Sequence, residues 1–121
     1  MSSSSGAAHS NLNGQVIEKL SRRNYVLWRT QITPQLRGAG VFGYIDGTSP
    51  EPAKLRAAKD KDGKDTFEPN PLHPLWVRED QQVLGFLLSN LSKEVLVTVT
   101  MANALWTTLA GMYSSQLLSR V

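Results

Sequence analysis

Residues 75–91, LWVREDQQVLGFLLSNL, decide the fold of this 121-residue chain. Apolar residues recur there at helical spacing and occupy more than one side of the helix. Two helix-start signals precede them, Asn70-Pro71 and His73-Pro74, because proline is tolerated in the first turn of a helix. A helix that is apolar on several sides belongs in the centre of a domain. Its predicted core residues are Trp76, Val83, Leu84, Leu87, Leu88 and Leu91.

A second helix is predicted to begin near Asn24. Pro34 lies inside it and predicts a kink, because proline removes one backbone hydrogen bond. Gly38 and Gly40 predict its end, since glycine adopts the left-handed conformation at little steric cost. Its predicted core residues share one face at a spacing of four and are Trp28, Ile32 and Leu36.

The third predicted helix follows residue 101 and is the most clearly amphipathic segment of the chain. Leu117 and Val121 continue its apolar spacing to the last residue, so we expect the sequence to be truncated within a helix. Its predicted core residues are Leu105, Trp106 and Leu109, and its apolar face also holds Ala102, Met112 and Tyr113.

Two segments between these helices are less regular. Residues 48–70 contain several prolines, a glycine and alternating charges, which predict an exposed loop with a short helix around Ala53–Lys59. A loop of this length is long for a compact domain and indicates a function, an insertion or disorder. Residues 93–98 are predicted to form a short helix, although the β-branched residues up to Thr100 are also compatible with a strand.

Together these patterns predict one all-α domain, a small helical bundle over residues 15–121, after a disordered tail at residues 1–14. An apolar fraction of 40% is enough for a core. The chain has no cysteine, which excludes disulfides, thiolate metal sites and cysteine nucleophiles. Its longest apolar stretch, Val83–Leu91, is far shorter than the ~20 residues that cross a bilayer. We therefore expect a cytoplasmic or nuclear protein without membrane contact.

Motifs for chemistry are sparse. Gly38–Gly43 match G-x-G-x-x-G, but a dinucleotide site needs these glycines between a strand and a helix, whereas here they follow a predicted helix. His9 and His73 lack a second ligand at helical spacing, which argues against a metal site. Glu79 and Asp80 are neighbours on a helix and point in different directions, so they form no acid–base pair. We expect no enzymatic activity, cofactor or small-molecule substrate.

Two candidate binding surfaces remain. An apolar surface near the end of the sequence would bind a protein, either a second copy or another chain. A basic surface in the first third would bind nucleic acid weakly, although a solvated helix face explains it equally well; the net charge is only +3. The apolar candidates are Met112, Leu117, Leu118 and Val121, and the basic candidates are Lys19, Arg22, Arg23 and Arg29.

Five short sequence motifs stand out between residues 15 and 121: Lys19-Leu20 with Asn24-Tyr25-x-x-Trp28; Leu36-Arg37-Gly38 with Phe42-Gly43-Tyr44-Ile45-Asp46-Gly47; Trp76-x-x-x-Asp80-Gln81-x-Val83-Leu84-Gly85; Leu88-Ser89-x-Leu91-Ser92-x-Glu94-Val95; and Ala104-Leu105-Trp106 with Met112-Tyr113-Ser114-Ser115. In this order and spacing they resemble the Gag polypeptides of copia-type retrotransposons found in plants. The resemblance implies a helical fold like the N-terminal domain of a retrotransposon or retroviral capsid, and self-association into shells around RNA. Such Gags often carry a CCHC zinc knuckle that binds RNA, and a chain without cysteine lacks that part.

The leading hypothesis is therefore a Gag-like, non-enzymatic module for self-assembly and protein interaction. One alternative is a monomeric host adaptor that binds a protein partner in a groove between helices. A second alternative is nucleic-acid binding through the basic surface. An active element's Gag, a decayed copy and a host protein derived from one all remain compatible with the sequence.

Overall fold

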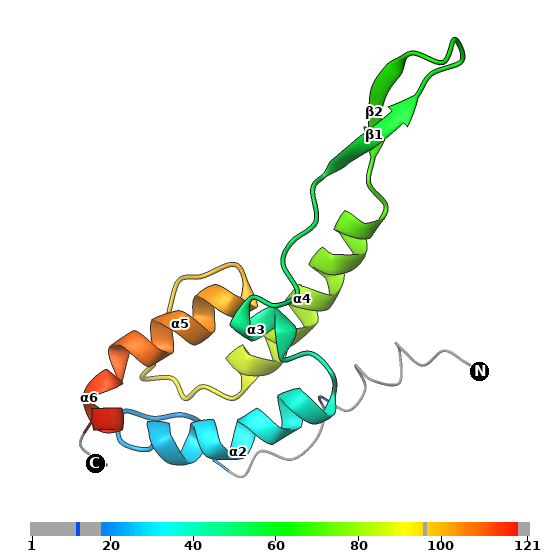
Figure 1. The fold of residues 1–121 in the computed structure, drawn as a ribbon. Helices are drawn as coiled ribbons and strands as arrows, with labels where there is room; N and C mark the ends of the chain where they lie inside the picture. The colour runs from blue at the N-terminus through cyan, green and yellow to red at the C-terminus, as the bar shows by residue number, and fades with distance from the viewer. Residues whose placement is uncertain (1–11, 13–17, 96, 119–121) are drawn as a thin grey trace.

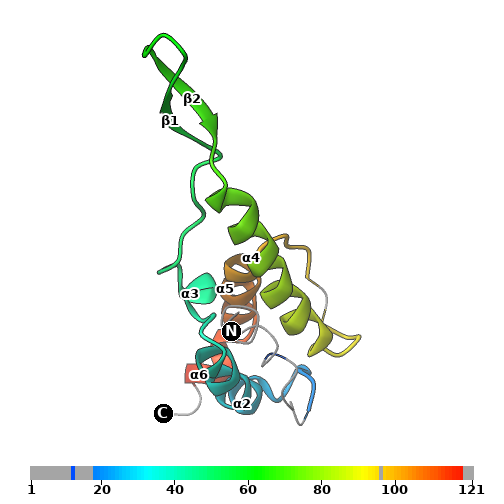
Figure 2. The ribbon, with the colours of Figure 1, turned by 90° about the vertical axis from the view of Figure 1, so that its right-hand side faces the viewer.

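The computed structural model describes residue 12, residues 18–95 and residues 97–118. Helices α2, α4 and α5 form a compact body, and a two-stranded antiparallel hairpin projects from it (Figure 1). The N-terminal end of α4 projects with the hairpin, as the view turned by 90° also shows (Figure 2). The elements are α2 (Tyr25–Gly38), α3 (Gly43–Asp46), β1 (Leu55–Lys59), β2 (Asp65–Pro69), α4 (Leu72–Ser89), α5 (Ala102–Met112) and α6 (Ser114–Leu118).

The prediction of an all-α bundle is wrong, because β1 and β2 pair in antiparallel register from Leu55 opposite Pro69 to Lys59 opposite Asp65. The chain is therefore mixed α and β. The short helix predicted around Ala53–Lys59 is wrong for the same reason, since most of that stretch is strand β1. Local turn chemistry decides the conformation: the Asp60 carboxylate accepts backbone N–H bonds from Asp62 and Lys64, both at 2.9 Å, and closes the hairpin.

The three long helices lie close to their predicted positions. Helix α2 contains Pro34 and ends at Gly38, and Gly40 adopts a positive φ of 76° that suits glycine. Helix α5 ends at Met112, and a separate short helix, α6, follows Tyr113 instead of one continuous helix. Residues 93–95 and 97–100 form neither the predicted helix nor the alternative strand. The predicted tail lies outside the described residues, except for the buried Leu12.

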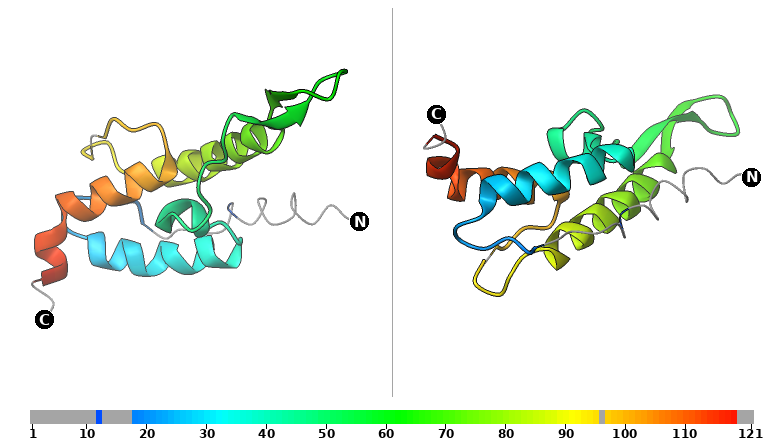
Figure 3. Two further views of the ribbon diagram at one scale, coloured as in Figure 1. Left: turned by 45° about the horizontal axis from the view of Figure 1, so that its top comes forward. Right: turned by 90° about the horizontal axis from the view of Figure 1, so that it is seen from below.

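The core lies between the faces of α2, α4 and α5 that were predicted to be apolar (Figure 3). Leu88 is an exception, because it points outward and is 40% exposed. Trp76, Leu91 and Trp106 are half-buried. The other predicted core residues are buried: Trp28, Ile32, Leu36, Val83, Leu84, Leu87, Leu105 and Leu109.

The segment before α2 is fixed to the end of α4. Leu20 forms a parallel bridge with Leu91, in which its N–H donates to the Asn90 carbonyl at 2.8 Å. The indole N–H of Trp28 donates to the same carbonyl at 3.0 Å. This tryptophan therefore fills the core and satisfies its one polar group there, as buried indoles usually do.

Asp80 is the one buried charged residue among those that the structure describes. Its carboxylate accepts the backbone N–H of Ala102, the first residue of α5, at 3.2 Å, and the side-chain amide of Gln81 at 3.1 Å. The carboxylate of α4 thus caps the positive end of α5. Burial raises the pKa of Asp80, and the hydrogen bonds from Ala102 and Gln81 oppose that rise.

We expect Asp80→Ala to lower the free energy of unfolding by about 2 kcal/mol, because the buried N–H of Ala102 loses its acceptor. Asp80→Asn keeps an acceptor and removes the charge. Since the folded-state pKa of Asp80 is raised, its stabilising contribution is complete below the ordinary value of 3.8 and is lost as the pH rises through the folded-state value. The Asn variant should therefore gain stability relative to wild type between about pH 3 and about pH 7, measured by denaturant unfolding.

Asp46→Asn is the matched control, and its pH trend has the opposite sign. The exposed Asp46 carboxylate accepts bonds from the N–H and hydroxyl of Thr48 at 3.0 and 2.7 Å, which lower its pKa. Its contribution is present above the unfolded-state pKa and is lost as the pH falls. The stabilities of the two variants relative to wild type should therefore change in opposite directions as the pH rises. Parallel curves of stability against pH would show that the trend does not arise at Asp80.

Candidate interaction site

The main exposed apolar surface lies on the projecting part of the molecule, residues 51–75, which we call the arm. It comprises the extended segment before the hairpin, the hairpin, and the first turn of α4 (Figure 1). Four of the seven exposed large apolar side chains in the described part of the chain lie on it. They are Leu55 at 56% exposure, Phe67 at 71%, Leu72 at 59% and Leu75 at 44%.

The hairpin has one fully exposed face. Side chains alternate along a strand, so Leu55 and Ala57 of β1 share a face with Phe67 and Pro69 of β2. All four are exposed. The opposite face carries the ion pair between Arg56 and Glu68, 2.7 Å apart. The exposed face therefore presents an apolar patch with no partner among the described residues.

Asn70 joins the hairpin to α4. Its side-chain amide donates to the Ala53 carbonyl at 2.9 Å, and its backbone N–H donates to the Lys54 carbonyl at 2.8 Å. Its side-chain oxygen accepts the N–H of Leu72 at 3.1 Å, which caps the start of α4. One side chain thus closes the open end of the hairpin and begins the helix.

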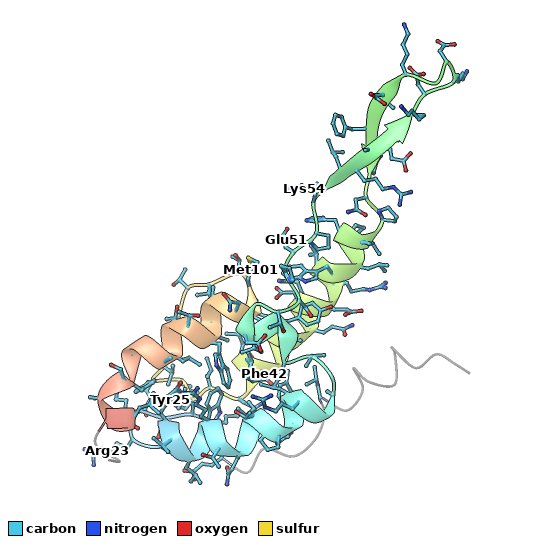
Figure 4. The ribbon with its side chains drawn as sticks, in the orientation of Figure 1. Arg23, Tyr25, Phe42, Glu51, Lys54 and Met101 are labelled. Atoms are coloured by element: carbon cyan, nitrogen blue, oxygen red, sulfur yellow. The ribbon has the colours of Figure 1, made fainter. Side chains whose placement is uncertain are left out.

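A second set of contacts holds the extended segment against α4. His73 bonds to the Glu51 carboxylate at 2.6 Å, and the indole N–H of Trp76 donates to the Ser49 carbonyl at 2.8 Å. Figure 4 shows Glu51 and Lys54 along the extended segment that leads from the body to the hairpin. Gly43 permits this path, because a Cβ there would collide with the Ser49 side chain.

Tyr44 fixes α3 to the same part of α4. Its ring lies 5.5 Å from that of Trp76, and its hydroxyl donates a hydrogen bond to the Glu79 carboxylate. Burial and this bond to a carboxylate raise the pKa of Tyr44, so the phenol stays protonated. The Asn103 side chain, at the start of α5, also donates to the Ile45 carbonyl. The arm therefore rests on a base anchored to two helices.

The predicted apolar surface near the end of the sequence is only partly present. Met112 is 46% exposed, but Leu117 packs against the core. Leu118 is the last residue of α6, and Val121 lies outside the described residues. Leu117 therefore stabilises the body, and the more extensive apolar surface is on the arm.

The structure divides the predicted basic surface. Lys19, Arg22 and Arg23 are exposed just before α2, and Figure 4 shows Arg23 at the end of the molecule away from the arm. Arg29 instead lies over the ring of Trp106, 5.8 Å from its centroid, in a cation–π contact. Glu94 accepts the backbone N–H of Arg22 at 2.9 Å and places a negative charge beside this group.

The candidate chemical motifs can be examined within residues 12, 18–95 and 97–118. No group of three His, Cys, Asp or Glu side chains is placed to hold a metal ion in that part of the chain. The Gly38–Gly43 motif follows helix α2 rather than a strand, so it lacks the geometry of a dinucleotide loop. No helix of the described residues is long and apolar enough to span a membrane.

Asn70 offers a test of how the arm is held. We expect Asn70→Ala to destabilise the start of α4 by about 1 kcal/mol, through loss of the cap to Leu72. Asn70→Asp keeps the capping oxygen and loses only the donor to Ala53. Amide hydrogen exchange should therefore show faster exchange at Leu72 in the Ala variant than in the Asp variant. Equal loss of protection in both variants would assign the anchoring to the Ala53 contact instead.

Two Arabidopsis thaliana proteins are similar to this chain, the retrovirus-related Pol polyproteins from transposons RE2 and RE1. The identity is 28% over 109 residues with RE2 and 29% over 110 residues with RE1. Each alignment covers 87% of this chain and 7% of the polyprotein, so the chain spans a small part of these relatives. No protein-family profile and no solved structure matches it. The similarity supports an origin in a plant retrotransposon polyprotein.

Proposed function

We propose that this chain is a non-enzymatic module for self-association, derived from the Gag portion of a copia-type retrotransposon. The five sequence motifs between Lys19 and Ser115, in their order and spacing, support the Gag assignment. The similarity to two plant transposon polyproteins supports the element of origin. The exposed arm supports a role in binding another chain.

The arm carries this proposal because it adds nothing to the core. Every buried residue of the described chain lies at or before Ile45, or at or after Asp80. The arm nevertheless exposes four large apolar side chains, and contacts of Asn70 with Ala53 and of His73 with Glu51 hold its own segments together. Exposed apolar groups on an ordered, projecting element are typical of an interface that is covered in an assembly.

Binding of a different protein and binding of RNA are the two alternatives. The basic residues support RNA binding less strongly than the arm supports self-association, because Arg29 already contacts the ring of Trp106. Light scattering on a size-exclusion column, at low and high protein concentration, separates the three. Growth in mass with concentration supports self-association, and a high ratio of absorbance at 260 to 280 nm identifies bound nucleic acid. A monomer free of nucleic acid contradicts the proposal.

We expect the double variant Phe67→Thr with Leu72→Gln to weaken self-association by at least about tenfold. Burial of one such side chain contributes ~1.5–3 kcal/mol, and ~1.4 kcal/mol corresponds to a factor of ten in the association constant. Both residues are exposed, so the fold should be retained. The matched control is Leu27→Gln with Leu88→Gln, which removes two exposed leucines outside the arm, at 50% and 40% exposure. Equal weakening by the control would show that the arm is not the interface.

A further inference from the structure

The hydrogen-bond register of the hairpin identifies which backbone groups are open. The Asn70 N–H donates to the Lys54 carbonyl at 2.8 Å, and the Asp60 N–H donates to the Lys64 carbonyl at 3.0 Å. Hydrogen-bonded pairs alternate along an antiparallel ladder, so the pairs between these ends involve residues 56 and 58 of β1. The N–H and carbonyl groups of Leu55, Ala57 and Lys59 consequently face away from β2.

The two edges of the hairpin are not equivalent. The outward positions of β2 are Asp65, Phe67 and Pro69, and the proline has no N–H to donate. The outward positions of β1 all carry both a donor and an acceptor. Proline on an edge strand is a recognised obstacle to pairing, so β1 is the edge that can accept another strand along its full length.

The sequence of β1 is complementary to itself. In an antiparallel pair centred on Ala57, this residue meets its own copy, Leu55 lies opposite Lys59, and Arg56 lies opposite Ala58. No basic residue lies directly opposite another basic residue. Lys59 is paired with Asp65, and Arg56 with Glu68, within each hairpin. The basic side chains of β1 are therefore neutralised before a second copy approaches.

The resulting four-stranded sheet would extend the apolar patch. Phe67 lies opposite Ala57 in the hairpin, so one row across the sheet reads Phe67, Ala57, Ala57 and Phe67. Pairing about a two-fold axis would point the two hairpins in opposite directions. Because the body lies at the base of the hairpin (Figure 1), the two bodies would then lie at opposite ends of the sheet. It adds about six backbone hydrogen bonds, and sheets of four strands are more stable than an isolated hairpin.

We infer that the outer edge of β1 pairs antiparallel, about Ala57, with the same edge of a second copy of this chain. This inference rests on the proposed self-association and specifies a backbone contact within it, which is distinct from the burial of the apolar side chains of Phe67 and Leu72. It requires the N–H of Ala57, which the hairpin itself does not use. The register also sets about 5.5 Å between the Cα atoms of the two Ala57 residues, within the range of about 4.4–6.8 Å that a disulfide spans.

Two substitutions of the full chain test the pairing. Ala57→Pro removes the outward N–H and leaves the bonds between β1 and β2 intact, so we expect at least a tenfold loss of self-association. Ala57→Ser keeps the outward N–H at the same position and should leave association unchanged. Hydrogen exchange at Ala58 and Thr66 verifies that the hairpin itself persists in both variants.

Single cysteines add a test of register, since the chain has no cysteine of its own. Under mild oxidation, Ala57→Cys should form a disulfide-linked dimer at least tenfold faster than Ala58→Cys, because Ala58 lies opposite Arg56 and not opposite its own copy. If the wild-type protein associates and Ala57→Pro associates equally well, the β1 pairing is overturned but self-association is not. The same conclusion follows if the two cysteine variants cross-link at equal rates. A wild-type protein that remains monomeric overturns both.

Discussion

The length of α4 is the constraint on which the rest of the structure depends. Its 18 residues span about 27 Å at 1.5 Å per residue. Its C-terminal half places Val83 and Leu87 in the core. The carbonyl of Asn90, just after the helix, accepts hydrogen bonds from the backbone N–H of Leu20 and the indole N–H of Trp28. Its N-terminal half runs beyond the body and begins at the base of the hairpin. One rigid element therefore joins the core to the arm, and the packing of the core sets the direction in which the arm projects.

Polar contacts refine this arrangement where apolar packing is not specific. Asp80 fixes the start of α5 against the middle of α4, and the side chain of Asn103 in α5 donates a hydrogen bond to the carbonyl of Ile45 in α3. Tyr44 and Trp76 then tie α3 and the following segment to the part of α4 beyond the core. These contacts are directional, so each defines one relative position of two elements. An apolar interface alone tolerates sliding more readily.

Sequence reasoning located the elements whose signal is periodic and missed those whose signal is not. The helices around Trp28, Val83 and Leu105 repeat their apolar residues every three or four positions, which a sequence displays directly. The hairpin was missed because charges and prolines obscured its strands, although Asp62-Gly63 is a turn signal of the kind that joins strands. The buried role of Asp80 depends on a residue 22 positions away, Ala102, and no local pattern reveals it. Leu88 was misassigned because a strongly apolar helix gives no sharp boundary between its inner and outer faces.

The anchoring of the arm has an energetic implication. A two-stranded hairpin is marginally stable in water by itself, and ordering each residue costs about 1–2 kcal/mol of conformational entropy. Here the hairpin buries no residue in the core, yet Asn70 and the Glu51–His73 contact hold its base in one position. An exposed, apolar and ordered segment gains most when a second surface covers it, because the ordering cost has already been met in the free protein. Pre-organisation of this kind favours association through the arm over its use as a flexible tether.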